Sequence, residues 1–265
     1  MTAAAAPAQA RASTGIRLAD VTAEYVPRQP TLSGLSLWAA PGRITVILGP
    51  NGSGKSTSLK VMAGLLQPWR GKVEIVRGAE THDLTGAPCH DRARHKIAYL
   101  PQGHSVFPAM SVHDNLVLGA WPLKRDRRAA AAAIAAAYER YPMLRDKRRV
   151  PAGSLSGGQQ RILEVARLLV ADPDLVLVDE PSTGVAPAVA SMMYVELARM
   201  RSEGRTVVLV DQDVRSALDI GDAVYTLRSG RNDRHGEVSE FAGDVTALAR
   251  EWLSAGPTAS EEKGG

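Results

Sequence analysis

The chain has 265 residues, of which 45% are hydrophobic and 23% charged, and its length suits one large α/β domain with a formal net charge of +4. Aromatic residues make up only 5%, which argues against a base-stacking nucleic-acid surface, and the single cysteine, Cys89, excludes a disulfide framework. No apolar run approaches the length of a membrane span.

The two ends of the chain differ in composition from its middle. Residues 1–12 are rich in alanine and lack a basic segment ahead of an apolar one, which predicts a disordered lead, not a signal peptide. We expect the lead to cover residues 1–15, a folded domain to cover residues 16–245, and a polar tail to cover residues 246–265. The lone cysteine is typical of a protein of the reducing cytosol.

The first part of the chain alternates β-like stretches with turn residues. Strands are predicted at residues 32–38, 43–48, 72–76 and 97–100. A glycine-rich loop follows residue 48, and a helix is predicted from Ser56 to about Leu65.

The later part of the chain changes character. Residues 112–150 are rich in Ala, Leu and Arg with almost no β-branched runs, which predicts helices. From residue 160 onward, helices and strands alternate. The predicted helices are 160–170, 188–201 and 215–220, and the predicted strands are 175–178, 206–210 and 223–227. This alternation indicates a parallel sheet with helices on its faces.

The glycine-rich loop has the pattern of a phosphate-binding P-loop. Its residues are Gly49, Pro50, Asn51, Gly52, Ser53, Gly54, Lys55, Ser56 and Thr57. Glycines let successive backbone N–H groups face one anion, and the following helix presents its positive N-terminus to the same anion. We expect Lys55 to contact the β- and γ-phosphates of a nucleotide and the Ser56 hydroxyl to bind Mg²⁺.

A pair of acids follows an apolar strand further along the chain. Residues 175–180 read Leu-Val-Leu-Val-Asp-Glu, so Asp179 and Glu180 come at the carboxyl end of a buried strand. Ligands bind at this edge of parallel sheets. We therefore expect Asp179 to lie near the Mg²⁺ held by Ser56, and Glu180 to polarise the attacking water.

A second glycine motif, Leu-Ser-Gly-Gly-Gln, occupies residues 155–159 and is called the signature motif below. Two glycines near the start of a helix leave backbone N–H groups open, which predicts a second anion site on the same chain. With the P-loop before it and the acidic pair after it, the chain resembles the ABC ATPases over about residues 16–245. The resemblance implies a P-loop ATPase with a mostly parallel sheet core, an antiparallel β subdomain and an inserted helical subdomain at about residues 103–165.

The resemblance also assigns roles to single residues. ABC ATPases hold each ATP, with Mg²⁺, between the P-loop of one subunit and the signature motif of another. The motif residues Ser156, Gly157, Gly158 and Gln159 are therefore expected to contact the partner's nucleotide. Gln102 matches the glutamine that reaches Mg²⁺ and water, and Tyr25 matches the aromatic residue that stacks on adenine.

Two positions depart from the common pattern of the family. Gln212 stands where a histidine usually contacts the γ-phosphate, and Ala186 stands where an aspartate is common in the loop after the acidic pair. These departures, with residues 99–119 and 141–158, resemble the ATPases of branched-chain amino acid importers and of related urea and amide importers. Such importers typically pair two different ATPases, so a heterodimer whose partner supplies histidine is the hypothesis here, with a homodimer as the alternative.

The resemblance implies further partners and a location. These are integral membrane permease subunits, an extracytoplasmic solute-binding protein, and a place at the inner face of the cell membrane, with no nucleic acid bound. Two other functions stay open on the sequence. One is a soluble ABC protein that acts on nucleic acid, and the other is a nucleotide-binding regulatory subunit that barely hydrolyses ATP.

Overall fold

Two β-sheets form the centre of the molecule. The computed structural model describes residues 13–103 and 105–241. The smaller sheet is antiparallel, in the order β2 (Gln29–Ala39), β1 (Thr14–Val26), β4 (Arg70–Arg77) and β5 (Glu80–Asp83). The larger sheet has the order β10 (Arg231–Glu237), β9 (Ala223–Arg228), β3 (Ile44–Leu48), β8 (Thr206–Val210), β7 (Leu175–Asp179) and β6 (Ile97–Leu100). It is parallel except where β10 pairs with β9.

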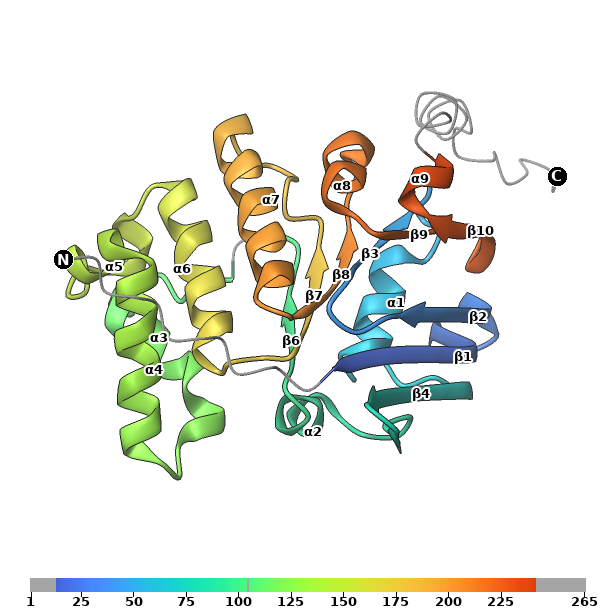
Figure 1. Ribbon diagram of the computed structural model, residues 1–265, viewed down its shortest axis with the longest axis horizontal. Helices are drawn as coiled ribbons and strands as arrows, with labels where there is room; N and C mark the ends of the chain where they lie inside the picture. Colours follow the sequence, from blue (N-terminus) through green and yellow to red (C-terminus); the bar gives the residue numbers. More distant parts are fainter. Residues whose placement is uncertain (1–12, 104, 242–265) are drawn as a thin grey trace, which may run out of the picture.

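The helices fall into two groups. Those packed on the sheets are α1 (Lys55–Met62), α2 (Cys89–Arg94), α7 (Pro187–Ser202), α8 (Val214–Ile220) and α9 (Val238–Phe241). The others are α3 (Val112–Gly119), η1 (Trp121–Leu123), α4 (Arg127–Arg140), α5 (Pro142–Asp146), η2 (Ala152–Ser154) and α6 (Gly157–Val170). Figure 1 shows α3 to α6 gathered at one end of the molecule and the antiparallel sheet at the other. None of the described helices is both long and apolar enough to span a bilayer.

The central strands form because their residues are apolar and buried on both sides. Every residue of β3, β7 and β8 is buried, as expected for parallel strands covered by helices on each face. Helix α1 contacts both sheets and lies between them, while α7 and α8 cover the other face of the larger sheet. The predicted strands at 43–48, 175–178 and 206–210 are confirmed to within a residue at each end.

Some predictions of single elements were incomplete or wrong. The helix predicted from Ser56 to Leu65 begins at Lys55 and ends at Met62, because Gly64 turns the chain with a φ of 71°. Strands β5 and β10 were not predicted, since their side chains are polar and nearly all exposed. The first strand begins at Thr14, two residues before the predicted start of the domain. The predicted lead and tail otherwise lie outside the described residues.

Three apolar clusters form the interior. One lies between the two sheets around α1, and a second lies under α7, α8 and α9. The third belongs to the helices at the end of the molecule and includes Leu116, Ile134, Leu144 and Leu163. The predicted helical stretch at 112–150 therefore has an apolar core that involves α6 as well.

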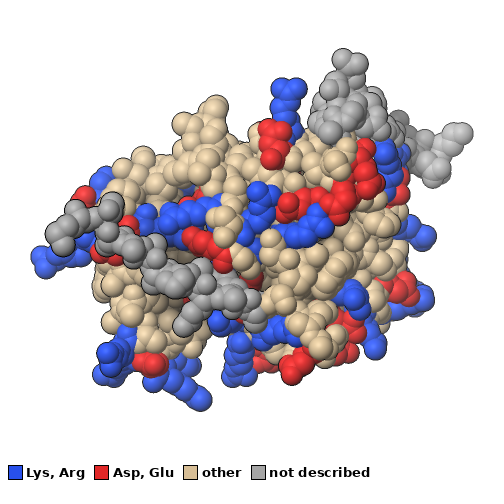
Figure 2. All heavy atoms as spheres, viewed as in Figure 1, with Lys and Arg blue, Asp and Glu red and all other residues tan. Residues whose placement is uncertain are grey.

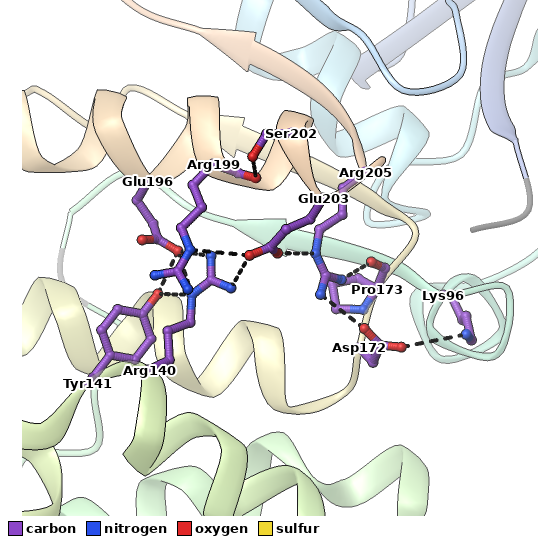
Figure 3. Close-up of polar contacts among 10 residues, drawn as sticks. All are labelled: Lys96, Arg140, Tyr141, Asp172, Pro173, Glu196, Arg199, Ser202, Glu203 and Arg205. Atoms are coloured by element: carbon purple, nitrogen blue, oxygen red, sulfur yellow. Dashed lines mark hydrogen bonds and ion pairs between the residues drawn. The ribbon is translucent and has the colours of Figure 1, made fainter. Parts of the chain in front are cut away.

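A polar network ties these helices to the rest of the protein. Arg140, at the end of α4, donates to Glu196 of α7 through Nε at 2.9 Å and through Nη2, and to Glu203 through Nη1 at 2.5 Å. The Tyr141 hydroxyl also donates to Glu196, at 2.7 Å, and Arg205 extends the network to the turn before β7 (Figure 3). On the surface, basic and acidic side chains interleave in a band across this face (Figure 2).

Candidate functional site

Most of the sequence-predicted residues meet at one edge of the larger sheet. Five of its strands, β9, β3, β8, β7 and β6, are parallel neighbours, so their carboxyl ends lie together. Gly49 follows β3, Gln102 follows β6 by two residues, Glu180 follows β7 and Gln212 follows β8 by two residues. The sheet topology thus brings together residues that are up to 163 positions apart in the sequence, from Gly49 to Gln212. This is the edge at which parallel α/β sheets bind ligands.

The P-loop is shaped for an anion. Gly49, Gly52 and Gly54 have φ values of 149°, 78° and 100°, in the region that favours glycine. A Cβ atom at Gly49 would lie 2.3 Å from the Leu227 carbonyl oxygen. No side chain caps the N-terminus of α1, so its first N–H groups face the loop, together with the positive end of the helix dipole.

Lys55 lies inside the loop. Its Nζ donates to the carbonyl oxygens of Gly49 at 2.8 Å and Pro50 at 3.0 Å. Burial lowers the pKa of Lys55, and the charges of Glu180 and Asp179 oppose that shift. A lysine ammonium inside a glycine-rich loop at a helix N-terminus suits phosphate oxygens. Ser53 and Thr57 are also buried here, and Asn51 is exposed.

Two hard oxygen donors fit a magnesium ion. The Ser56 hydroxyl donates to Oδ1 of Asp179 at 2.8 Å, which leaves its lone pairs available to a cation. The Tyr99 hydroxyl donates to Oδ2 of the same carboxylate at 2.9 Å. Burial raises the pKa of Asp179, while the bonds from Ser56 and Tyr99 lower it. One carboxylate and one hydroxyl suit Mg²⁺, which takes most of its ligands from water and substrate phosphates.

Glu180 is the centre of a hydrogen-bond cluster. Its backbone has a φ of 45°, an unusual conformation for a residue other than glycine and one that clusters at functional sites. Its backbone N–H donates to the Val210 carbonyl at 2.7 Å. Its Oε2 accepts from the amides of Gln102 and Gln212, each at 2.7 Å, and from the Thr183 hydroxyl at 3.1 Å.

Asp211, to which the sequence analysis gave no role, holds the segment that carries Gln212. Its carboxylate accepts hydrogen bonds from the hydroxyls of Ser182 and Tyr194 and from the backbone N–H groups of Gln212 and Asp213. Burial raises the pKa of Asp211, and these bonds oppose the shift. The only sequence signal for this role is its place directly after an apolar strand.

The signature motif begins α6. Ser156 caps this helix by accepting from the Gln159 backbone N–H, and the Gln159 side chain accepts from the Ser156 N–H at 3.2 Å and from Lys147 at 3.0 Å. The hydroxyl of Ser156 and the N–H groups of Gly157 and Gly158 remain at an exposed helix start. Figure 1 separates α6 from α1, with β6 to β8 between them. The two segments predicted to bind an anion, the P-loop and the signature motif of one chain, therefore lie apart.

Tyr25, the predicted adenine contact, is 54% exposed near the end of β1. The Lys60 ammonium, on α1, lies 5.5 Å from the centre of its ring. Tyr25 is thus beside the helix that follows the P-loop, on the solvent side, where a base could stack on it.

The sequence and fold together define the class of this protein. The sequence pattern of the ABC transporter family matches residues 32–183, more than half of the chain. The chain belongs to this family and is an ABC transporter ATP-binding subunit, an enzyme that hydrolyses ATP. The predicted fold class, a mostly parallel core sheet with an antiparallel sheet and a helical part, is confirmed.

Several known proteins are similar to it. The branched-chain amino acid transport ATP-binding protein BraG of Pseudomonas aeruginosa is 33% identical over 82% of this chain and 90% of its own length. The corresponding LivF protein, named as probable, of Archaeoglobus fulgidus is 37% identical over 75% and 82%. The lipopolysaccharide export protein LptB of Acidithiobacillus ferridurans is 34% identical over 82% and 88%. A solved nucleotide-free ATP-binding cassette has a TM-score of 0.76 at 25% identity, over 88% of this chain and 95% of that one.

Proposed function

We propose that this subunit uses ATP hydrolysis to drive solute import, and that the site at the sheet edge is where ATP is bound and cleaved. The observation that carries the proposal is the convergence of Lys55, Ser56, Asp179, Glu180 and two glutamines at one edge. Residues 49–57 would hold the phosphates, with Tyr25 against adenine, and Ser56, Asp179 and Gln102 would hold Mg²⁺. When bound, this ion would neutralise charge on the β- and γ-phosphate oxygens.

Glu180 is the proposed general base. Its carboxylate is already held by Gln102 and Gln212, so it has a defined direction from which to orient water for in-line attack on the γ-phosphate. Gln212 can donate a hydrogen bond to the phosphate but cannot take up a proton at neutral pH. The Gln212 amide would therefore position the phosphate without changing its own protonation state.

The nucleotide is proposed to complete a dimer. The P-loop and the signature motif of one chain lie apart, so one ATP bound at the P-loop needs the Ser156–Gly158 segment of a second subunit to close over it. Gln212 and Ala186 support a heterodimer in which the other ATPase carries histidine and aspartate. ATPase activity of each subunit alone and of the mixture tests this pairing, and full activity without gain on mixing would contradict it.

A groove between α2, β6, α3 and α6 is the proposed contact with the membrane permease. Its volume is about 480 Å³, and the large apolar side chains Leu65, Phe107 and Leu118 are exposed along it. Arg92 and Arg167 also line it. All three guanidinium nitrogens of Arg92 and one of Arg167, Nη1, are buried without a hydrogen-bond partner among the described residues. Burial lowers the pKa of Arg92 to about 10, and the charge of Asp83 opposes this shift.

Those features of the groove fit a cytoplasmic helix of a permease subunit, provided that this helix has an apolar face and an acidic residue.

Phe107→Glu should abolish co-purification with the permease and leave ATP binding intact, because Phe107 is 50% exposed and outside the sheet-edge site. Val195→Glu is the matched control, since Val195 is 70% exposed on α7 and does not line the groove. Equal loss of the complex in both variants would contradict a permease contact at this groove.

Branched-chain amino acids are the proposed cargo, which reaches the permease from a solute-binding protein on the other side of the membrane. BraG and LivF, both named for this transport, support it. LptB, which is named for lipopolysaccharide export, is 34% identical to this chain, so identity alone does not separate the two kinds of cargo. The test is uptake by the complete transporter in vesicles loaded with ATP. Uptake of labelled leucine, isoleucine or valine is expected. Uptake of urea and of none of these amino acids would show that the cargo is urea, and it would leave the proposed ATPase function unchanged.

A further inference from the structure

Tyr99 connects the sheet-edge site with the groove. Its hydroxyl donates to Oδ2 of Asp179 at 2.9 Å, while Ser56 donates to Oδ1 from the other side at 2.8 Å. Both oxygens of the carboxylate are thus held by separate elements, β6 and α1. A carboxylate held at both oxygens has a fixed plane and cannot rotate about its terminal torsion.

The pairing of β6 and β7 places this hydroxyl. Tyr99 lies opposite Leu177 in the parallel register, and Asp179 is two residues further along β7, on the same face as Leu177. Tyr99 and Asp179 are therefore diagonal neighbours across adjacent strands, a distance that a long aromatic side chain can reach. The position of the hydroxyl follows from strand register and needs no movement of a loop.

The ring of Tyr99 is fixed by its surroundings. It packs against the apolar cluster between the sheets and also lines the groove, three residues before Gln102. A rigid ring with a polar tip can hold its partner in place with little loss of side-chain freedom. The same side chain therefore touches both the proposed permease contact and the acid of the phosphate site.

We propose that Tyr99 is a positioning residue for the magnesium site, which it serves by fixing the Asp179 carboxylate. The proposal rests on the function proposed above, in which Asp179 holds Mg²⁺ next to Ser56. With the carboxylate fixed, its oxygens already have the direction in which the ion needs them. Without the hydroxyl, the carboxylate of Asp179 is held only at Oδ1 by Ser56, so its plane must be fixed when the ion binds, and the affinity for Mg²⁺ falls.

A purely packing role for Tyr99 leads to a different expectation. Phenylalanine has the same ring and nearly the same volume, so Tyr99→Phe preserves the packing in the cluster and the groove wall. Only the bond to Asp179 is lost. Packing alone predicts that Tyr99→Phe behaves as the unchanged protein, whereas positioning predicts a selective defect toward Mg²⁺.

The test is equilibrium binding of a fluorescent ATP analogue as Mg²⁺ is titrated, with Glu180→Gln present in every protein so that hydrolysis does not interfere. Tyr99→Phe should raise the Mg²⁺ concentration for half-saturation about five- to ten-fold, somewhat less than the full contribution of a hydrogen bond to a charged group, because Ser56 still holds the carboxylate. Binding of the analogue in excess EDTA should be unchanged. In an Asp179→Asn background, Tyr99→Phe should have little further effect, because the partner charge is absent.

Tyr225→Phe is the matched control. It removes a tyrosine hydroxyl that accepts from the Trp38 backbone N–H at 3.1 Å, away from Asp179, and it should leave Mg²⁺ dependence unchanged. An equal Mg²⁺ half-saturation in Tyr99→Phe and in the parent protein would overturn the proposal. Thermal unfolding checks the fold, and Tyr99→Leu is the second variant if phenylalanine is not tolerated. If the parent protein binds the analogue without any Mg²⁺ dependence, the magnesium site itself is wrong.

Discussion

The side-chain amide nitrogen of Gln212 lies 2.7 Å from Oε2 of Glu180 and donates a hydrogen bond to it. A histidine at position 212 would be a titratable donor to the same carboxylate, and the negative charge would raise its folded pKa above the ordinary value of about 6.5. A raised pKa means that the added stability is fully present below about pH 6.5 and is lost as the pH rises through the folded pKa.

The thermal stability of Gln212→His, relative to that of the parent protein, should therefore be higher at pH 6 than at pH 8. The gain should be at most about 1 kcal/mol, because this side chain is exposed. Thermal unfolding of both proteins at the two pH values measures it. In a Glu180→Gln background the pH-dependent difference should vanish, and a difference that persists there would remove Glu180 as the partner.

Glu180→Gln should bind ATP and hydrolyse it at least about a hundred-fold more slowly, because the amide cannot accept a proton from the attacking water. Glu139→Gln is the control, because Glu139 forms an exposed ion pair with Arg145. This variant should retain full turnover. Nucleotide binding and phosphate release under identical conditions provide the comparison. Near-normal turnover in Glu180→Gln would take the base role away from this residue.

Gly49→Ala should weaken ATP binding by about ten-fold or more and lower the stability of the protein. The added Cβ would lie 2.3 Å from the Leu227 carbonyl oxygen, and the φ of 149° is strained for alanine, so the loop must move. Gly86→Ala is the matched control, because its Cβ would meet no atom within 4 Å. Calorimetric titration with ATP and thermal unfolding report the two effects. Parent-like binding by Gly49→Ala would show that the loop conformation is not required.

Arg140→Met should destabilise the protein by about 3–5 kcal/mol, because it leaves the largely buried Glu196 without the cation it pairs with, whereas Glu203 keeps its ion pairs with Arg199 and Arg205. The side chains of Arg140 and Glu196 are only 14% and 13% exposed. Arg145→Met removes an arginine from a pair in which the side chains are 45% and 76% exposed, and it should cost less than about 1 kcal/mol. Urea unfolding of both variants measures the contrast, and equal losses would show that burial does not decide the contribution of these pairs.

The parts of the fold predicted from sequence are those with a local signal. The runs that form β3, β7 and β8 are continuously apolar, and the P-loop carries its own glycine pattern. Strands β5 and β10 have no such signal, because their polar residues are held by backbone pairing to a neighbouring strand.

The residues of the candidate site divide in the same way, into those with a local sequence signal and those without one. Lys55, Asp179 and Glu180 could be predicted because each belongs to a short motif. The bond of Tyr99 to Asp179 could not, since it joins positions 80 residues apart through strand register. The bond of Arg140 to Glu196 spans 56 residues and depends on where the tertiary fold places the end of α4 relative to α7. Such contacts are set by tertiary structure and leave no local pattern.

The mass of the Glu180→Gln protein in solution, with and without ATP and Mg²⁺, tests most directly whether two chains close around nucleotide. Light scattering should show a monomer without ATP and a dimer with it, either alone or after mixing with the second ATPase of the same transporter. The dimer should be lost in Lys55→Ala, which removes the proposed phosphate contact, and in Ser156→Arg, which blocks the proposed contact of the signature motif with the nucleotide of the facing subunit. A protein that binds ATP at one site per chain and stays monomeric in both samples would contradict the shared site.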